Sequence, residues 1–280
     1  MLLVLTGLGI YFGYRLKIGL NYHWNWAAIP QFLFRFDQEQ GRWVSGLIIQ
    51  GLLTTIRLSV GACVLATVFG LVMGLGRTGR SFFNKILGTA YVELIRNLPP
   101  LVLIFIFYFF VSDRIMPLLG VEELVRSSTG TARALLEFFC GRIELIPAFL
   151  SALVTLAIYE GAYITEIVRA GIQSIEPGQW EASSALGMTR FQQLRHVILP
   201  QAVRRILPPL AGQLISTIKD SAIVSVISVQ ELTFQGMELM SATYLTFETW
   251  LIVGVLYLLL CLSLSLLVNR METKLNRFQV

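Results

Sequence analysis

Five apolar runs, each long enough to cross a bilayer, limit what this chain can fold into more than any other feature of its sequence. A helix needs about 20 residues to cross a hydrocarbon core about 30 Å thick. Because lipid offers no hydrogen-bond partners, a run of this kind crosses it as a helix, whose backbone groups pair internally. Only 14% of the 280 residues are charged, well below the roughly 25% of soluble domains. We therefore predict an all-α integral membrane protein with five core transmembrane helices, around residues 44–75, 88–111, 148–168, 206–228 and 249–269.

The basic residues indicate which side of the membrane each connection occupies. The net charge is +5, and short cytoplasmic loops of membrane proteins carry an excess of Lys and Arg. Such residues gather at 77–85, 169–205 and 270–277, which we assign to the cytoplasm. The connection 230–248 contains three Glu and no Lys or Arg, and 112–147 has roughly balanced charges, so both are assigned to the outer face. The expected location is the cytoplasmic (inner) membrane, crossed several times.

The same pattern divides the chain into three parts, with no flexible linker between them. Residues 44–270 form one membrane domain, and residues 271–280 form a cytoplasmic tail. Residues 1–43 form an N-terminal segment with an outer-face stretch. Its residues 1–14 are apolar but marginal in length for a sixth transmembrane helix, so this span stays open. Residues 112–147 are predicted to form short outer-face helices, because Pro and Gly interrupt them; their role also stays open.

A polar, basic segment from Glu181 to Pro200 lies between two apolar runs, inside the cytoplasmic loop 169–205. It predicts two short amphipathic helices, the first ending at Gly187 and the second beginning at Thr189, whose hydroxyl can cap free N–H groups. Pro200 is expected to end the second helix before the next run. The loop is much longer than the roughly 2 to 8 residues that join packed helices, and it carries more apolar side chains than a solvated loop needs. We interpret it as a docking site for another protein, with a solvated amphipathic loop as the alternative.

The sequence offers no constellation typical of an enzyme. It has no phosphate-binding GxxxxGK[ST] motif, so any ATP hydrolysis must belong to a partner. The only two histidines, His23 and His196, are not accompanied by a Ser and a carboxylate as in a catalytic triad. Cys63, Cys140 and Cys261 are isolated, which predicts neither a disulfide framework nor a metal site. We expect a transport subunit rather than an enzyme, with no cofactor of its own.

Charged residues inside the apolar runs are candidates for a solute path. A charge at the bilayer centre costs about 3 kcal/mol or more unless it faces protein or water. Glu93 and Arg96, three residues apart near the inner end, are expected to pair within the bundle or to extend to the membrane interface rather than to line the path. Helix breaks at Pro99–Pro100 and Pro208–Pro209 are expected to expose backbone dipoles to the solute. The remaining charges are assigned to the path, with structural pairing inside the bundle as the alternative: Arg57, Glu160, Lys219 and Asp220.

Three further segments carry a family resemblance together with the loop. They are 93–100 (ELIRNLPP), 159–172 (YEGAYITEIVRAGI) and 219–227 (KDSAIVSVI). In this order they resemble the polar-amino-acid branch of ABC importer permeases, over roughly residues 46–270. The loop resembles that family's EAA motif, the contact to the ATPase subunits, at Glu181, Ala182, Ser183, Gly187, Val197, Leu199 and Pro200. Ser183 stands where the motif usually has a second Ala and Val197 where it has Ile, and both departures are mild.

The resemblance implies a type I ABC importer permease fold and a permease subunit that moves amino acids, polar ones in particular, by alternating access. It also implies partners: a dimer of ATP-binding subunits that holds ATP and Mg, a second permease subunit, identical or homologous, and an extracytoplasmic amino-acid-binding protein. Nucleic acid is not an expected partner. The alternatives are an ion-coupled secondary transporter that uses Glu160 or Asp220, and an ABC permease for a different small solute. Which amino acid is carried stays open.

Overall fold

The computed structural model describes residues 22–38, 41–79 and 81–276, together with the isolated positions 7, 11 and 15. The possible span at residues 1–14 therefore lies outside the described residues, apart from two positions. Within the described residues, five helical segments are long and apolar enough to cross a membrane, which confirms the predicted fold class. These segments are Leu47–Thr78, Pro100–Leu118, Ile143–Gln173, Arg190–Ile227 and Thr246–Arg270.

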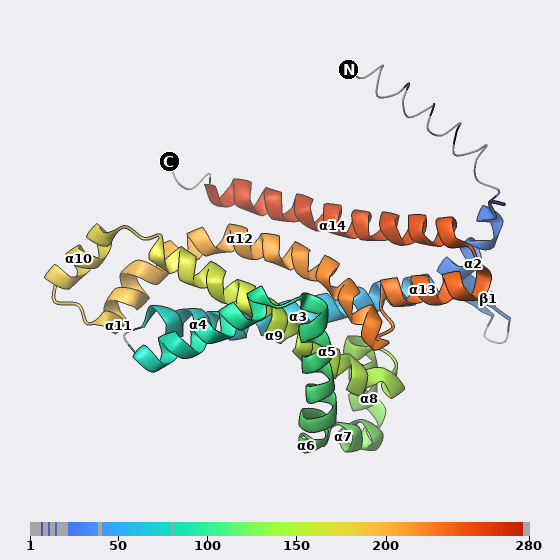
Figure 1. The fold of residues 1–280 in the computed structure, drawn as a ribbon, viewed down its shortest axis with the longest axis horizontal. Coiled ribbons are helices and arrows are strands. Elements are labelled where there is room, and N and C mark those ends of the chain that lie inside the picture. The colour runs from blue at the N-terminus through green and yellow to red at the C-terminus, as the bar shows by residue number, and fades with distance from the viewer. Residues whose placement is uncertain are drawn as a thin grey trace.

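The longest helices lie along the long axis of the molecule (Figure 1). They are α3 (Leu47–Thr78), α9 (Ile146–Gln173), α12 (Leu199–Asp220) and α14 (Thr246–Asn276). Figure 1 shows α3, α9 and α12 beside one another, with α14 on the far side of α12. The direction of these helices gives the molecule two distinct ends.

The two ends carry different short elements. At one end lie α10 (Pro177–Ala185) and α11 (Arg190–Gln192), which belong to the basic loop and so mark the cytoplasmic end (Figure 1). At the other end lies an antiparallel hairpin of β1 (Phe34–Asp37) and β2 (Arg42–Ser45). The remaining outer elements are η1 (Trp26–Ala28), α2 (Pro30–Leu33), η5 (Ser221–Ile227) and α13 (Leu232–Thr243).

The segment before α2 is tied to the start of α14. The backbone N–H of Asn25 donates to Glu248 Oε1 at 2.7 Å, and the Tyr22 hydroxyl donates to the other carboxylate oxygen. The Tyr22 ring also meets the Phe247 ring edge-on, with centroids 4.8 Å apart. Aromatic residues of this kind are typical of the membrane–water interface, so these contacts fix the N-terminal segment at the outer end.

Helix α9 packs closely along α3 because glycines let the two backbones approach. A Cβ on Gly70 would stand 2.6 Å from Ile164 Cγ2, and one on Gly74 would stand 2.7 Å from Val168 Cβ. Both distances are too short for real atoms, so only Gly fits at these two positions. The apolar residues that join α3, α9 and α12 toward the cytoplasmic end form the inner core cluster: Ala66, Ala157, Ile164, Val168, Ile172, Ile175, Ile198, Ala202 and Ile206.

The predicted second span is two helices rather than one. Helix α4 (Phe82–Asn97) ends before Pro99, and α5 (Pro100–Phe110) leaves in a new direction, away from the long axis (Figure 1). Proline disfavours helical backbone in the residue before it, and Leu98 is accordingly extended, with φ −103° and ψ 150°. The break predicted here is confirmed. The outer-face segment then forms the expected short helices: η2 (Val111–Ile115), α6 (Met116–Leu118), α7 (Val121–Ser127), α8 (Gly130–Cys140) and η3 (Ile143–Leu145).

Two other predicted breaks are wrong. Pro208 and Pro209 lie inside α12, which continues through them. Both are exposed, and transmembrane helices tolerate Pro where nearby groups satisfy the freed backbone. Pro200 is the second residue of α12, directly after the π-helical turn η4 (Gln193–Ile198), and at a helix start a missing N–H costs little. One helical segment therefore runs from α11 through to η5.

Candidate functional site

Hydrogen bonds fix the end of α10. The N–H of Gly187 donates to Ser184 O at 2.9 Å, and the N–H of Met188 donates to Ser183 O at 3.2 Å. These are the two bonds of a Schellman motif, which ends a helix on a residue in the left-handed conformation. Gly187 has φ +74°, a value that Gly adopts without steric cost. The predicted end of the first loop helix is confirmed.

A capping box fixes the start of α11. Thr189 Oγ1 accepts from Gln192 N at 3.4 Å, and Thr189 N donates to Gln192 Oε1 at 2.8 Å. Gln193 Nε2 donates back to Met188 O at 3.2 Å. The second loop helix therefore begins at Thr189 as predicted, and the turn between α10 and α11 is bonded on both sides.

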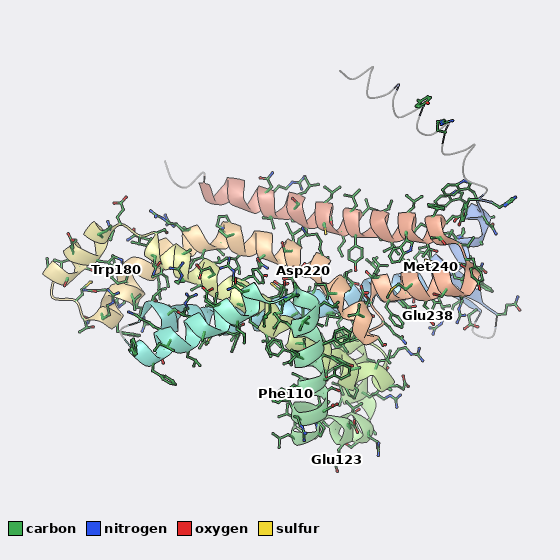
Figure 2. The ribbon with its side chains drawn as sticks, in the orientation of Figure 1. Phe110, Glu123, Trp180, Asp220, Glu238 and Met240 are labelled. Carbon is green, nitrogen blue, oxygen red and sulfur yellow. The ribbon has the colours of Figure 1, made fainter. Side chains whose placement is uncertain are left out.

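The α10–α11 pair is anchored to the long helices. Trp180 packs against the inner core cluster, and the Arg190 guanidinium carbon lies 3.7 Å from the centroid of its ring, a cation–π contact. Gln201 Nε2 on α12 donates to Gln179 Oε1 on α10 at 3.1 Å. Figure 2 shows Trp180 at the end of the molecule where α10 lies. These contacts join α10 and α11 to α9 and α12.

Three motif residues face the interior. Ser183 is 3% exposed and its Oγ donates to Trp180 O at 3.0 Å, which explains why a small side chain is needed and why Ser replaces Ala without strain. Val197 and Leu199 are half-buried and pack against the inner core cluster. These three residues therefore hold the loop against the long helices.

The other side of the pair is exposed. Two large apolar side chains beside the turn, Leu186 at 79% and Phe191 at 69% exposure, form what we call the exposed tip. Exposed apolar side chains in this position are typical of a surface that another protein covers. The other motif residues are exposed as well: Glu181, Ala182, Gly187 and Pro200.

Glu160 is a fully buried carboxylate on α9. Its Oε2 accepts from Gln213 Nε2 on α12 at 2.6 Å, while Oε1 has no hydrogen-bond partner among the described residues. The half-buried carboxyl of Asp220, at the end of α12, lies close enough to interact with it. Figure 2 shows Asp220 near the middle of the molecule, away from both ends. Two carboxyls and an amide therefore meet between α9 and α12, and carboxylates form strong hydrogen bonds with ammonium groups.

The other two charges assigned to the solute path lie apart from this pair. Lys219 precedes Asp220 in the sequence, but its side chain is exposed. Arg57 on α3 lines a cavity of about 740 Å³ toward the outer end, together with Arg35 and Arg142, and Glu160 does not line this cavity. The structure therefore brings together only Glu160 and Asp220 of the predicted set.

Glu93 and Arg96 each have a partner other than the other. Glu93 Oε2 accepts from Asn97 Nδ2 at 2.8 Å, and the Arg96 guanidinium lies over the Tyr163 ring, 5.8 Å from its centroid. Among the described residues, no ion pair joins the two charges. The partner of Glu93 is an amide one turn along α4, and the partner of Arg96 is an aromatic ring on α9. The sequence spacing of the two charges did not predict either partner.

Most of the membrane domain agrees in sequence with a known family model. Residues 66–277 match the binding-protein-dependent transport system inner membrane component. The chain belongs to this family. It is therefore a multi-pass permease of the inner membrane, and the match includes both α10–α11 and the contact between α9 and α12.

Curated relatives cover almost the whole permease. It is 33% identical over 259 residues to the glutamine transport system permease protein of Escherichia coli K12, which covers 92% of this chain and 99% of the relative. It is 33% identical to a probable glutamine ABC transporter permease protein of Bacillus subtilis 168, covering 82% and 94%. The glutamate/aspartate import permease of Escherichia coli K12 is 31% identical, covering 92% and 97%.

Solved structures agree on the fold of the permease. A chain from the crystal structure of an amino acid ABC transporter with histidines has a TM-score of 0.64 and 33% identity, covering 81% of this chain and 94% of that one. A chain of the inward-facing methionine ABC transporter has a TM-score of 0.62 at 20% identity, a likeness that concerns the fold alone. The predicted type I importer fold is confirmed.

The permease has a second buried carboxylate, that of Glu231, whose burial was not predicted from the sequence. Glu231 caps α13 and is fully buried. It accepts from Phe234 N at 2.8 Å, from the Tyr257 hydroxyl at 2.8 Å and from Thr55 Oγ1 at 3.3 Å. Its carboxylate therefore joins α13 to α14 and α3. The only signal in the sequence was an acidic residue directly before an apolar helix start, inside a connection that its charge assigned to the outer loop.

We expect Glu231→Ala to lower the free energy of unfolding by about 3 kcal/mol, because three donors lose the buried carboxylate that they share. The measurement is the thermal unfolding temperature of the purified permease in detergent. Glu238→Ala is the control, since Glu238 lies on the same helix but is exposed (Figure 2). Equal shifts for the two variants would contradict the structural role of Glu231.

Proposed function

We propose that this permease is the transmembrane subunit of an ATP-driven importer of amino acids, and that partner ATPase subunits dock on α10 and α11. The observation that carries the proposal is the exposed tip, Leu186 and Phe191, held beside a turn that is hydrogen-bonded on both sides. An apolar pair on a rigid support loses little conformational entropy when a partner covers it. The proposed coupling residues are Glu181, Ala182, Ser183, Gly187, Val197, Leu199 and Pro200.

The fourth span is a continuous helical segment, which supports the transfer of motion from the α10–α11 pair to the transmembrane helices. Helix α11 leads through η4 directly into α12 without a loop, and α10 is joined to α9 by the short connection 174–176. In the proposal, closure of the ATPase dimer on ATP and Mg displaces the α10–α11 pair. The anchored helices α9 and α12 then move with it, and the permease alternates between outward-open and inward-open states.

The proposed solute path follows the contact between α9 and α12. Glu160 and Asp220 bind the ammonium of the amino acid as it passes, because an ammonium supplies the donors that the unpartnered Glu160 Oε1 lacks. Lys219, which precedes Asp220 in the sequence, and Arg57 in the outer cavity meet the solute carboxylate. Similarity to permeases named for glutamine and for glutamate/aspartate supports a polar amino acid as the solute.

The proposed assembly contains more than this chain. Two ATPase subunits hold ATP and Mg and perform the hydrolysis, and a second permease subunit, identical or homologous, completes the path. An extracytoplasmic binding protein delivers the amino acid to the outer end. The family description, which names binding-protein-dependent transport, supports this last partner.

The function is tested by reconstituting the permease in proteoliposomes with the ATPase and the binding protein that are encoded beside it. We expect uptake of labelled glutamine or a similar polar amino acid to require all three proteins and ATP. Competition with a panel of unlabelled amino acids, a dipeptide and a metal salt then identifies the solute class. Uptake by the permease alone, driven by an ion gradient without ATP, would show an ion-coupled transporter and overturn the proposal.

A further inference from the structure

A second cavity, of about 780 Å³, lies at the cytoplasmic end of the permease. The ends of α3, α4, α9 and α10 line it, at the level where the long helices leave the bilayer. Four cationic side chains reach it: Arg77, Lys85, Arg169 and Arg190. Neither Leu186 nor Phe191 lines the cavity, so it is separate from the exposed tip.

Cations outnumber carboxylates around this cavity. Arg77 and Arg169 share one carboxylate, that of Glu166, with Arg77 Nη1 at 2.8 Å from Oε2 and Arg169 Nε at 3.0 Å from the same oxygen. Glu181 is the one acidic residue among those that line the cavity. The Arg190 guanidinium lies over the Trp180 ring. The other three cations, Arg77, Lys85 and Arg169, face two carboxylates, Glu166 and Glu181, which leaves a formal excess of one positive charge. An anion that entered would meet this excess together with the hydroxyl of Thr89.

Helix α4 places the cavity beside lipid. Lys85 and Thr89, one turn apart, turn one face of α4 to the cavity. The apolar side chains of Phe82 and Phe83 on the same helix are 76% and 71% exposed. A basic cavity between transmembrane helices, on the cytoplasmic side and next to apolar surface, has the features of a site for an anionic headgroup.

We propose that this cavity binds a phosphate-bearing anion, supplied either by the headgroup of a phospholipid in the inner leaflet or by a soluble phosphate compound. Lys85 binds the phosphate oxygens, and Thr89 donates a hydrogen bond to them. Arg77 and Arg169, which bond to Glu166, add positive charge to the cavity wall. The cavity wall includes Trp180 and Glu181 of α10, so a bound phosphate holds α10 against the ends of α3 and α9. Occupancy therefore stabilises the position of the proposed coupling helix.

The test measures binding to the full-length permease, purified and delipidated in a neutral detergent, by native mass spectrometry. Phosphatidylglycerol and phosphatidylcholine are added in parallel, and inorganic phosphate and glycerol 3-phosphate form the soluble arm. We expect Lys85→Gln to weaken phosphatidylglycerol binding about fivefold, the effect of one cation near an anionic surface. Lys85→Arg is expected to retain binding, because it keeps the charge.

The matched control is Arg204→Gln, which removes an exposed cation of α12 that does not line the cavity. We expect it to change phosphatidylglycerol binding by less than about twofold. Soluble phosphates that displace the lipid would identify a free phosphate compound as sufficient, and binding of the lipid alone would identify the headgroup as the ligand. Equal losses for Lys85→Gln and Arg204→Gln, or no loss for Lys85→Gln, would overturn the proposal.

Discussion

Replacing Glu160 with Gln is expected to lower amino-acid uptake at least about tenfold while leaving the permease inserted and assembled. The substitution keeps the shape of the side chain and its contact with Gln213, which donates to Oε2 at 2.6 Å. It removes the charge that the solute ammonium meets, and a hydrogen bond to a charged group contributes about 1.5–3 kcal/mol. The measurement is ATP-driven uptake in proteoliposomes, normalised to the amount of permease that co-purifies with the ATPase.

Two further variants separate a path role from a structural role at Glu160. Asp220→Asn is expected to lower uptake as well, because the two carboxyls lie together. Ser151→Ala removes another buried polar group of α9, whose Oγ bonds only to the carbonyl of Pro147, and it is expected to transport almost normally. Loss of assembly without a specific loss of uptake in Glu160→Gln would show that the carboxylate is structural.

The features that could be predicted from the sequence depend on residues close to one another along the chain. The two loop helices were predictable because Gly187 and Thr189 act on their nearest neighbours, through a Schellman motif and a capping box. The break at Pro99–Pro100 was predictable for the same reason, since Pro restricts the residue before it. Long apolar runs likewise gave the membrane fold, because lipid leaves the backbone no alternative.

The features that could not be predicted from the sequence depend on contacts between residues far apart along the chain. Glu160 and Gln213 are 53 residues apart, and Glu231 reaches Thr55 across 176 residues, so no local pattern distinguishes a satisfied carboxylate from a functional one. The same reasoning applies to Arg96, since the Tyr163 ring under its guanidinium comes from another helix. The path of α12 through its prolines also depends on which side of the helix they face, a property that only the packed structure fixes.

Replacing Gly187 with Val is expected to lower solute-stimulated ATP hydrolysis and ATPase co-purification about tenfold. A Cβ at this position would meet nothing within 4 Å, so the effect arises from the backbone and not from a clash. A left-handed residue other than Gly costs about 1–2 kcal/mol, and a β-branched side chain is among the least tolerant of positive φ. The turn then opens, and the exposed tip loses its fixed position relative to α10 and α11.

The control for Gly187→Val is the same substitution at Gly178, in the first turn of α10. Gly178 also has open space around a Cβ, but it lacks a positive φ, so Gly178→Val is expected to retain most of the coupling. Gly187→Asn is expected to fall between the two, because Asn adopts the left-handed conformation more readily than Val. ATPase activity is therefore expected to decrease in the order Gly178→Val, Gly187→Asn, Gly187→Val, because backbone strain increases in that order. Coupling that is normal in Gly187→Val would show that the ATPase does not depend on this turn, and the docking surface would have to lie elsewhere on the cytoplasmic end.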